Sequence, residues 1–168
     1  VHRFMGRRKR DHLRAVLGLP EVNEQWKEMQ GTDPTEEDVE MLYQLAERML
    51  LEQATHFADP VPHLGTAMEA VRRRGLKVGS TTGYTANVME RLAPEAKKHG
   101  FEPDSWVASD QVREGRPWPW MLFANLEKLG VCPPGSVLKI GDTLVDLEEG
   151  MNAGVWNVAV VQSSSLIG

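Results

Sequence analysis

The chain has 168 residues, of which 41% are hydrophobic, and a formal net charge of −5. This length and composition are typical of a globular protein that buries one main core and carries a small appendage. No apolar run approaches the roughly 20 residues of a membrane span, the N-terminus does not resemble a secretory signal, and the single Cys132 predicts a reducing cytoplasmic setting.

The N-terminal segment is basic, although the whole chain is acidic. Residues 1–14 contain one acid, Asp11, among several cations. Basic runs often bind nucleic acid, but this run belongs to no recognisable nucleic-acid motif and the overall charge argues against such a partner. We therefore expect none. The cations are Arg3, Arg7, Arg8, Lys9, Arg10 and Arg14.

Residues 10–58 are predicted to be helical, with helices over 11–17 and 20–30 and a long helix that begins after Thr35. Thr35 is followed by three acids, which is typical of an N-cap and a first helical turn. Apolar residues then recur at helical spacing. The Pro-rich run 59–62 ends this pattern and predicts a linker or hinge. We expect a helical cap domain over 1–58 and a core domain over 59–168.

The second half of the chain alternates between helix and strand patterns. Such alternation with short loops predicts an α/β fold with a parallel, doubly wound sheet and helices on both faces. The predicted helices are 64–74, 85–99, 119–129 and 144–152, and the predicted strands are 76–80, 106–107, 137–140 and 155–161.

Two carboxylates follow the predicted strand 137–140. Gly141 allows a turn, and Asp142 and Asp146 lie at that turn and at the start of the next helix. The carboxyl ends of parallel strands are where open α/β sheets bind ligands, and carboxylate oxygens suit Mg²⁺ that faces a phosphate. In the alternative interpretation, Asp142 or Thr143 only caps the helix and Asp146 is solvated.

Two further segments carry groups that suit a phosphate. Hydroxyls followed by Gly83 and Tyr84 end the predicted strand 76–80, and a helix begins directly after them. Arg116 lies between a glycine and a proline before another helix, where a guanidinium could neutralise a phosphate. In the alternative interpretation, the hydroxyl segment only supplies an ordinary threonine N-cap and Arg116 is a surface arginine.

The order Thr-Gly, Arg-Pro and Gly-Asp-x-x-x-Asp resembles motifs two, three and four of the haloacid dehalogenase superfamily of phosphotransferases. The resemblance implies a Rossmann-like parallel sheet with an α-helical cap. It also implies that Thr82 is the threonine of motif two, Arg116 the cation of motif three, and Asp142 and Asp146 the acidic pair.

Residues 5–12, 79–84 and 115–121 are more specifically similar to the phosphonoacetaldehyde hydrolase (phosphonatase) family. The Met-Gly-x-x-Lys-x-x-His run of 5–12 separates that family from generic phosphatases of the superfamily. The resemblance implies that Lys9 forms a Schiff base with the substrate aldehyde and that His12 assists it. It further implies substrate-binding roles for Met5, Gly83 and Tyr84, with Thr82.

The implied chemistry suits these residue types. A C–P bond breaks only if the departing carbanion is delocalised, and an iminium formed from the aldehyde accepts those electrons. Lys9 must be neutral to attack, and the neighbouring arginines would lower its pKa in a partly desolvated site. His12 follows three residues later on the same helix face and could move protons. The alternative is a solvated lysine in a basic run.

The family's first motif, an Asp-x-Ala-Gly-Thr type segment with the nucleophilic aspartate, does not occur in the sequence. We therefore expect the first core strand to be absent from this chain and its own C–P cleaving activity to be low. The resemblance implies a Mg²⁺ cofactor with Asp142 as ligand and Asp146 behind it, a small-molecule phosphonate substrate, and a homodimer through the cap. Alternatives are a generic phosphatase or phosphomutase, or a non-catalytic decayed fragment.

Overall fold

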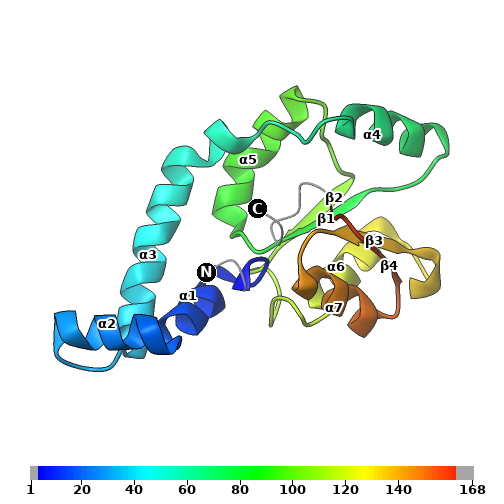
Figure 1. The fold of residues 1–168 in the computed structure, drawn as a ribbon. Coiled ribbons are helices and arrows are strands. Elements are labelled where there is room, and N and C mark those ends of the chain that lie inside the picture. Colours follow the sequence, from blue (N-terminus) through cyan, green and yellow to red (C-terminus); the bar gives the residue numbers. More distant parts are fainter. Residues whose placement is uncertain (1–3, 162–168) are drawn as a thin grey trace.

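The computed structural model describes residues 4–161, and its first part is helical (Figure 1). The helices are α1 (Lys9–Leu17), α2 (Pro20–Gln30) and α3 (Glu36–Gln53), and the short 3-10 helix η2 (Ala54–Phe57) continues α3. Helices α2 and α3 both pack against α1, and the three helices form a lobe that we call the cap lobe. This lobe lies to one side of the strands in Figure 1.

Helix α3 begins where the sequence predicts. The Thr35 hydroxyl accepts a hydrogen bond from the Asp38 amide at 3.3 Å, and the Asp38 carboxylate accepts one from the Thr35 amide at 2.8 Å. This reciprocal pair is a capping box, which satisfies two amides that the first helical turn leaves unpaired. The capping fixes the start of the long helix that connects the cap lobe to the rest of the chain.

The remaining elements alternate between helices and strands, as the sequence predicts. They are α4 (Leu64–Arg73), β1 (Gly79–Thr82), α5 (Ala86–Lys98), β2 (Ser105–Ala108), α6 (Trp120–Leu129), η3 (Pro134–Ser136), β3 (Leu138–Gly141), α7 (Leu144–Ala153) and β4 (Trp156–Ala159). The end of α3 and η2 pack against α5, so the cap lobe and the strand-bearing part are in direct contact.

Strand β1 differs from its prediction, because it covers Gly79–Thr82 rather than 76–80. Pairing with β2 decides its position, since Gly79 lies opposite Ser105 and Thr82 opposite Ala108. The shift places Thr81 and Thr82 inside the strand, at its carboxyl end.

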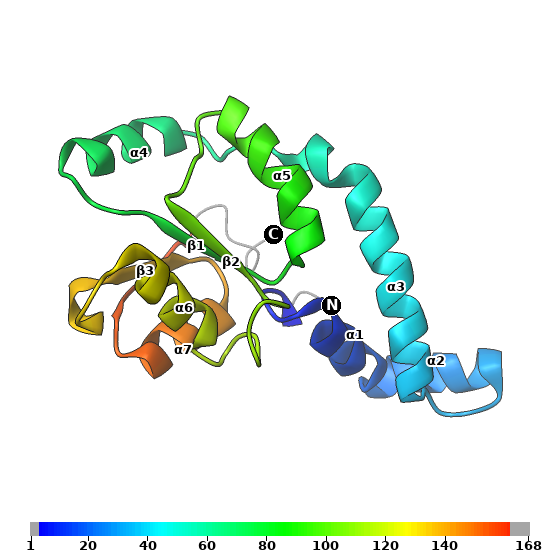
Figure 2. The ribbon, with the colours of Figure 1, turned by 180° about the vertical axis from the view of Figure 1, so that it is seen from behind.

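The strands are parallel, and within residues 4–161 they form two separate pairs. Strand β1 pairs with β2, and β3 pairs with β4 in a register that sets Leu138 opposite Trp156. Helix α6 packs on the first pair, α7 on the second, and the two helices pack on each other (Figure 2). The carboxyl ends of β1 and β3 are thereby held in one region of the molecule.

A buried apolar cluster includes side chains of both helices. It joins Leu122 of α6, Ala153 of α7 and Val155 before β4, with Val137 packed against it. Burial of such side chains is the main favourable contribution to folding. Of the helices placed in residues 4–161, none is both long enough and apolar enough to cross a membrane.

Candidate active site

The loop that precedes α1 lies against the ends of both β1 and β3. A Cβ atom added at Gly83 would come within 2.6 Å of the Arg7 carbonyl oxygen, and one added at Gly6 within 2.5 Å of the Thr143 hydroxyl. Gly6 also has φ +86°, a conformation that side chains disfavour. These glycines permit a close approach that brings the start of α1 over the strand ends.

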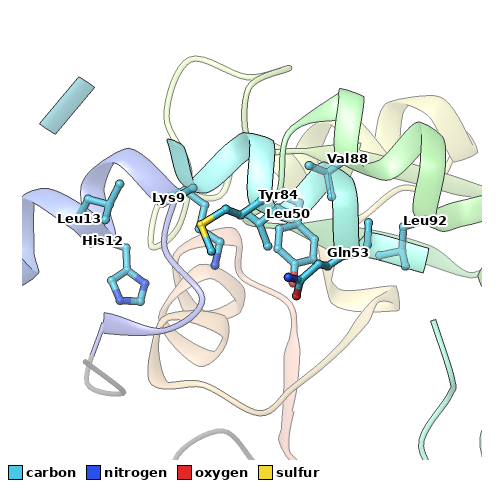
Figure 3. Close-up of a pocket in the computed structure, with 11 residues that line it drawn as sticks. Lys9, His12, Leu13, Leu50, Gln53, Tyr84, Val88 and Leu92 are labelled. Atoms are coloured by element: carbon cyan, nitrogen blue, oxygen red, sulfur yellow. The ribbon is translucent and has the colours of Figure 1, made fainter. Parts of the chain in front are cut away.

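A cavity of about 410 Å³ opens between the cap lobe and α5. Its polar groups are Lys9 and His12 from α1, Gln53 from α3, and Tyr84 from the loop after β1. Figure 3 shows Lys9 extending from α1 toward Tyr84. The other side chains that line it are Leu13, Ala46, Met49, Leu50, Ala54, Val88 and Leu92.

Lys9 lies half-buried in this cavity, not in bulk solvent as the alternative interpretation held. Its Nζ lies 5.2 Å from the centre of the Tyr84 ring, within the range of a cation–π contact. Burial lowers the pKa of Lys9 from its ordinary value of 10.5. The predicted partial desolvation is confirmed as the cause of this pKa shift, whereas the expected contribution of the arginines is not, because Arg8 and Arg10 are engaged elsewhere.

His12 is buried beside Lys9, with its ring at an edge-to-face angle to Phe4 and the centroids 6.4 Å apart. Burial lowers the pKa of His12, and the positive charges of Lys9 and Arg7 lower it further. The imidazole is therefore neutral at pH 7 and has a nitrogen that can accept a proton. Met5 lies half-buried in the loop that leads into α1.

Thr82 does not cap α5. Its hydroxyl accepts a hydrogen bond from the Tyr84 amide at 3.1 Å, which shapes the loop after β1. The N-cap residue of α5 is Thr85, whose hydroxyl instead donates to Glu47 of α3 at 2.8 Å. This bond is a second direct connection between the cap lobe and the strand ends.

Arg116 is buried, with only 8% of its surface exposed, so it is not a surface arginine. Its Nε donates to Glu149 Oε2 at 3.0 Å and lies 3.1 Å from Asp146 Oδ1. Its Nη2 donates to the Thr81 carbonyl at 2.7 Å, and its Nη1 donates to the Gly6 carbonyl at 3.2 Å. The guanidinium therefore joins β1, α7 and the loop before α1.

Lys139 and Glu149 complete this buried cluster, and neither was identified from the sequence. Lys139 Nζ lies 3.0 Å from Asp146 Oδ1, 2.9 Å from Glu149 Oε2 and 2.8 Å from Thr81 Oγ1. Two signals were available: Lys139 is a charged residue within a predicted strand, and Glu149 follows Asp146 by three residues on one helix face. The cluster connects β1 to β3 through side chains.

Asp146 is buried and ion-paired, not solvated as the alternative held. Burial acts to raise the pKa of this carboxyl, but the charges of Arg116 and Lys139 outweigh burial and the pKa is lowered. Its Oδ2 accepts a hydrogen bond from the Thr143 hydroxyl at 2.6 Å. The other half of that alternative is confirmed, because Thr143 and Asp146 form the capping box of α7.

The acids at this turn differ in what they offer a metal ion. Among residues 4–161 no group of three or more His, Cys, Asp or Glu is arranged to hold one. Both oxygens of Asp146 are engaged by neighbouring side chains, so Asp146 does not fit a direct ligand. Asp142 is half-buried at the end of β3. Mg²⁺ is commonly bound by one carboxylate together with phosphate oxygens and water. Asp142 fits the role of that carboxylate.

The predicted site residues thus fall into two neighbouring groups. Lys9, His12 and Tyr84 line the cavity, whereas Arg116 and Asp146 belong to the buried ionic cluster beside it. Residues 5–8 connect the groups, since the Gly6 carbonyl contacts Arg116 and the loop continues into α1. Thr82 is the last residue of β1, Asp142 directly follows β3, and this loop covers both strand ends.

Comparison with known proteins confirms the family resemblance that the motifs indicate. Residues 2–154 match the model of the haloacid dehalogenase-like hydrolase family. The chain is 44% identical over 98% of its length to a bifunctional phosphonoacetaldehyde hydrolase/aminoethylphosphonate transaminase of Clostridioides difficile, and 42% identical over 98% to a phosphonoacetaldehyde hydrolase of Bacillus cereus. It spans 26% and 62% of these two curated relatives.

Solved structures share the fold. A phosphonoacetaldehyde hydrolase-like protein from Oleispira antarctica superposes with a TM-score of 0.92 at 31% identity, over 95% of this chain and 58% of that one. A hydrolase from Pseudomonas syringae superposes with a TM-score of 0.71 at 20% identity, over 94% of this chain and 66% of that one. The second likeness bears on the fold alone.

Proposed function

The chain belongs to the haloacid dehalogenase-like hydrolase family, and from this premise we propose that it is the part of a phosphonoacetaldehyde hydrolase that activates the aldehyde. The reaction converts phosphonoacetaldehyde and water to acetaldehyde and phosphate. The observation that supports the proposal best is the half-buried amine of Lys9 in its cavity, on a segment whose Gly6 carbonyl accepts a hydrogen bond from the buried guanidinium of Arg116.

Lys9 is the nucleophile toward the aldehyde carbon. Its lowered pKa increases the neutral fraction of the amine at pH 7, and only the neutral amine attacks. The amine and the carbonyl form an imine with loss of water. When a nucleophile takes the phosphoryl group, which water finally releases as phosphate, the protonated imine takes up the electrons of the C–P bond as an enamine. His12, neutral and in the same cavity, moves the protons of imine formation and hydrolysis.

Arg116 and Thr82 hold the phosphonyl oxygens. Arg116 Nη1 donates one of its two N–H groups to the Gly6 carbonyl at 3.2 Å, so its second N–H is the donor that we expect to face the substrate. Thr82 supplies a hydroxyl at the end of β1, with the Gly83 backbone beside it and Tyr84 over the amine. A charge-assisted contact of this kind fixes the orientation of the phosphonate.

Mg²⁺ is the cofactor that this donor set suits. Asp142 would bind it, and Asp146 would orient the turn that carries Asp142 through its contacts with Thr143 and Arg116. The ion would neutralise charge on the phosphonyl oxygens. We propose that this chain alone cleaves little C–P bond, since Asp146 and Glu149 are both engaged in ion pairs and are poor nucleophiles toward phosphorus.

The setting and assembly also remain proposals. A cytoplasmic location suits the exposed free thiol of Cys132. A homodimer through the cap suits the apolar stripe of α3, where Met41, Leu45 and Met49 are exposed at helical spacing. The partners that we expect are thus a small phosphonate and a second copy.

Reductive trapping tests the proposed function. The chain is incubated with phosphonoacetaldehyde and borohydride, and the modified peptide is identified by mass spectrometry. We expect a stable adduct on Lys9, abolished by Lys9→Arg because a guanidinium forms no such imine. Lys27→Arg is the matched control, since Lys27 is an exposed lysine paired with Asp33. A phosphatase or phosphomutase function predicts no selective adduct on Lys9, and that result would overturn the proposal.

A further inference from the structure

The side chain of Arg8 inserts into the loop between β2 and α6. Its Nε donates to the Ser109 carbonyl at 2.8 Å, and its Nη1 donates to the Arg113 carbonyl at 2.9 Å. Its Nη2 donates to the carbonyls of Ser109 and Val112. All three guanidinium nitrogens therefore hold backbone oxygens of one loop, residues 109–115, which we call the arginine-binding loop.

Gly115 provides the space through which Arg8 reaches this loop. A Cβ atom at Gly115 would come within 2.6 Å of Arg8 Cγ and 3.1 Å of its Cδ. Those atoms belong to the stem of Arg8, so any side chain at Gly115 displaces the arginine. Arg8 and Gly115 thus form a complementary pair across the contact of the cap lobe with the strand-bearing part.

The two segments that form this contact are each adjacent in sequence to a residue of the proposed reaction. Arg8 directly precedes Lys9, and the arginine-binding loop ends directly before Arg116. A second bond, from Arg116 Nη1 to the Gly6 carbonyl, runs between the same two segments in the opposite direction. The segment that carries the Lys9 amine and the segment that carries the Arg116 guanidinium are therefore joined by hydrogen bonds in both directions.

We propose that Arg8 is a positioning residue that sets the separation between the Lys9 amine and the Arg116 guanidinium, and so selects aldehydes that carry a phosphonate on the neighbouring carbon. This inference rests on the proposed function. Arg8 does not bind the substrate, since its donors are engaged by backbone carbonyls. It acts by preventing the arginine-binding loop from moving relative to α1.

Arginine is the residue type that this role requires. A planar guanidinium directs several donors at fixed angles, whereas a lysine ammonium is a point charge on a flexible stem. Three carbonyls around a rigid fork define both distance and orientation, and an error of an ångström between reacting groups costs up to about 100-fold in rate.

The test compares two aldehydes on the purified chain. Acetaldehyde needs only Lys9 to form a trapped adduct, whereas phosphonoacetaldehyde also uses the Arg116 side of the site. We expect Arg8→Met to lower the ratio of the phosphonoacetaldehyde to the acetaldehyde trapping rate roughly tenfold, while the acetaldehyde rate stays within about twofold. Hydrogen exchange of the amides of 109–116 should become faster, with α6 unchanged.

Arg10→Met is the matched control. Arg10 belongs to the same basic run but pairs with Glu40 at 2.8 Å and lies over the Tyr43 ring, both within the cap lobe. Its loss removes the same charge without touching the arginine-binding loop, so the ratio should stay within about twofold of wild type. Gly115→Ala disturbs the same contact from the other side, so it should lower the same ratio of trapping rates. It provides the test if Arg8→Met does not fold.

The outcomes separate the two levels of inference. An unchanged ratio in Arg8→Met and Gly115→Ala overturns the positioning role, as does an equal fall of both trapping rates with faster exchange throughout the chain. If neither aldehyde gives a Lys9 adduct in the wild-type chain, the proposed function itself fails. An acetaldehyde adduct with no preference for the phosphonate in wild type overturns the positioning role alone.

Discussion

At the scale of single residues, the site depends on burial rather than on the charge of neighbouring side chains. Lys9 stands in a run of arginines, yet Arg8 is directed at the arginine-binding loop and Arg10 at Glu40. The pKa of Lys9 is lowered because its amine lies in a cavity lined mainly by apolar side chains. The apolar wall of the cavity therefore sets the pKa of Lys9 and, through it, the fraction of neutral amine.

This cause makes a prediction about pH. The amine attacks only when neutral, so the rate of adduct formation rises as pH passes upward through the folded-state pKa of Lys9. We expect the midpoint of that rise to lie below the ordinary value of 10.5. Leu50→Ser, which wets the cavity wall, should move the midpoint upward, because less desolvation means less penalty for the charged form. The trapping rate as a function of pH measures both, and a wild-type midpoint at or above 10.5 contradicts the account.

At the scale of elements, α7 contributes two acids to the buried cluster from one helix face. Glu149 has no exposed surface, and its Oε2 accepts from both Arg116 and Lys139. The cluster contains two cations and two carboxylates, so the removal of one acid leaves an uncompensated positive charge in the interior. Such removal costs far more than the loss of an exposed ion pair.

Glu149→Gln should therefore lower the free energy of unfolding by about 3 kcal/mol, the range seen when one partner of a buried ion pair is removed. Glu148→Gln is the matched control: it changes the same residue type on the same helix, but at an exposed position, and should cost less than about 0.5 kcal/mol. Urea denaturation measures both variants. A loss below about 1 kcal/mol in Glu149→Gln would show that the cluster tolerates the unbalanced charge.

Features that depend on local contacts could be predicted from the sequence. The N-caps Thr35 and Thr143 are local, because each bonds to a residue three positions later, and the helix starts follow from that spacing. Family motifs identified Lys9, Arg116 and Asp146, although their contacts were not predictable. The start of β1 depends on its partner strand, and the sequence alone placed it too early.

Long-range contacts set the limit. Arg8 and Ser109 are separated by 101 positions, and nothing in the basic run distinguishes Arg8 from Arg10. Glu149 resembles the exposed Glu148 beside it until the helix is placed against β1 and β3. Side chains that act through distant partners become identifiable only when the fold brings those partners together.

At the scale of the whole molecule, apolar side chains are exposed on several parts of residues 4–161, and two of these surfaces are suited to association. One is the sheet face of β3 and β4, where Ile140 and Trp156 are 60% and 70% exposed and Leu138 and Val158 lie on the same face. The other is the stripe of α3 that includes Leu45. Contiguous exposed apolar residues promote association.

These surfaces should have separable effects on the size of the protein in solution. We expect the sheet face to join the proposed cap dimers of the wild-type chain into larger species, because two different surfaces on one chain allow open-ended association. Ile140→Lys should reduce these species to a dimer, since a charge on the sheet face opposes stacking. Adding Leu45→Lys should give a monomer, because it disrupts the proposed cap contact. Light scattering after size exclusion measures the mass of each. A monomer with Ile140→Lys alone would assign the association to the sheet face and contradict the dimer through the cap.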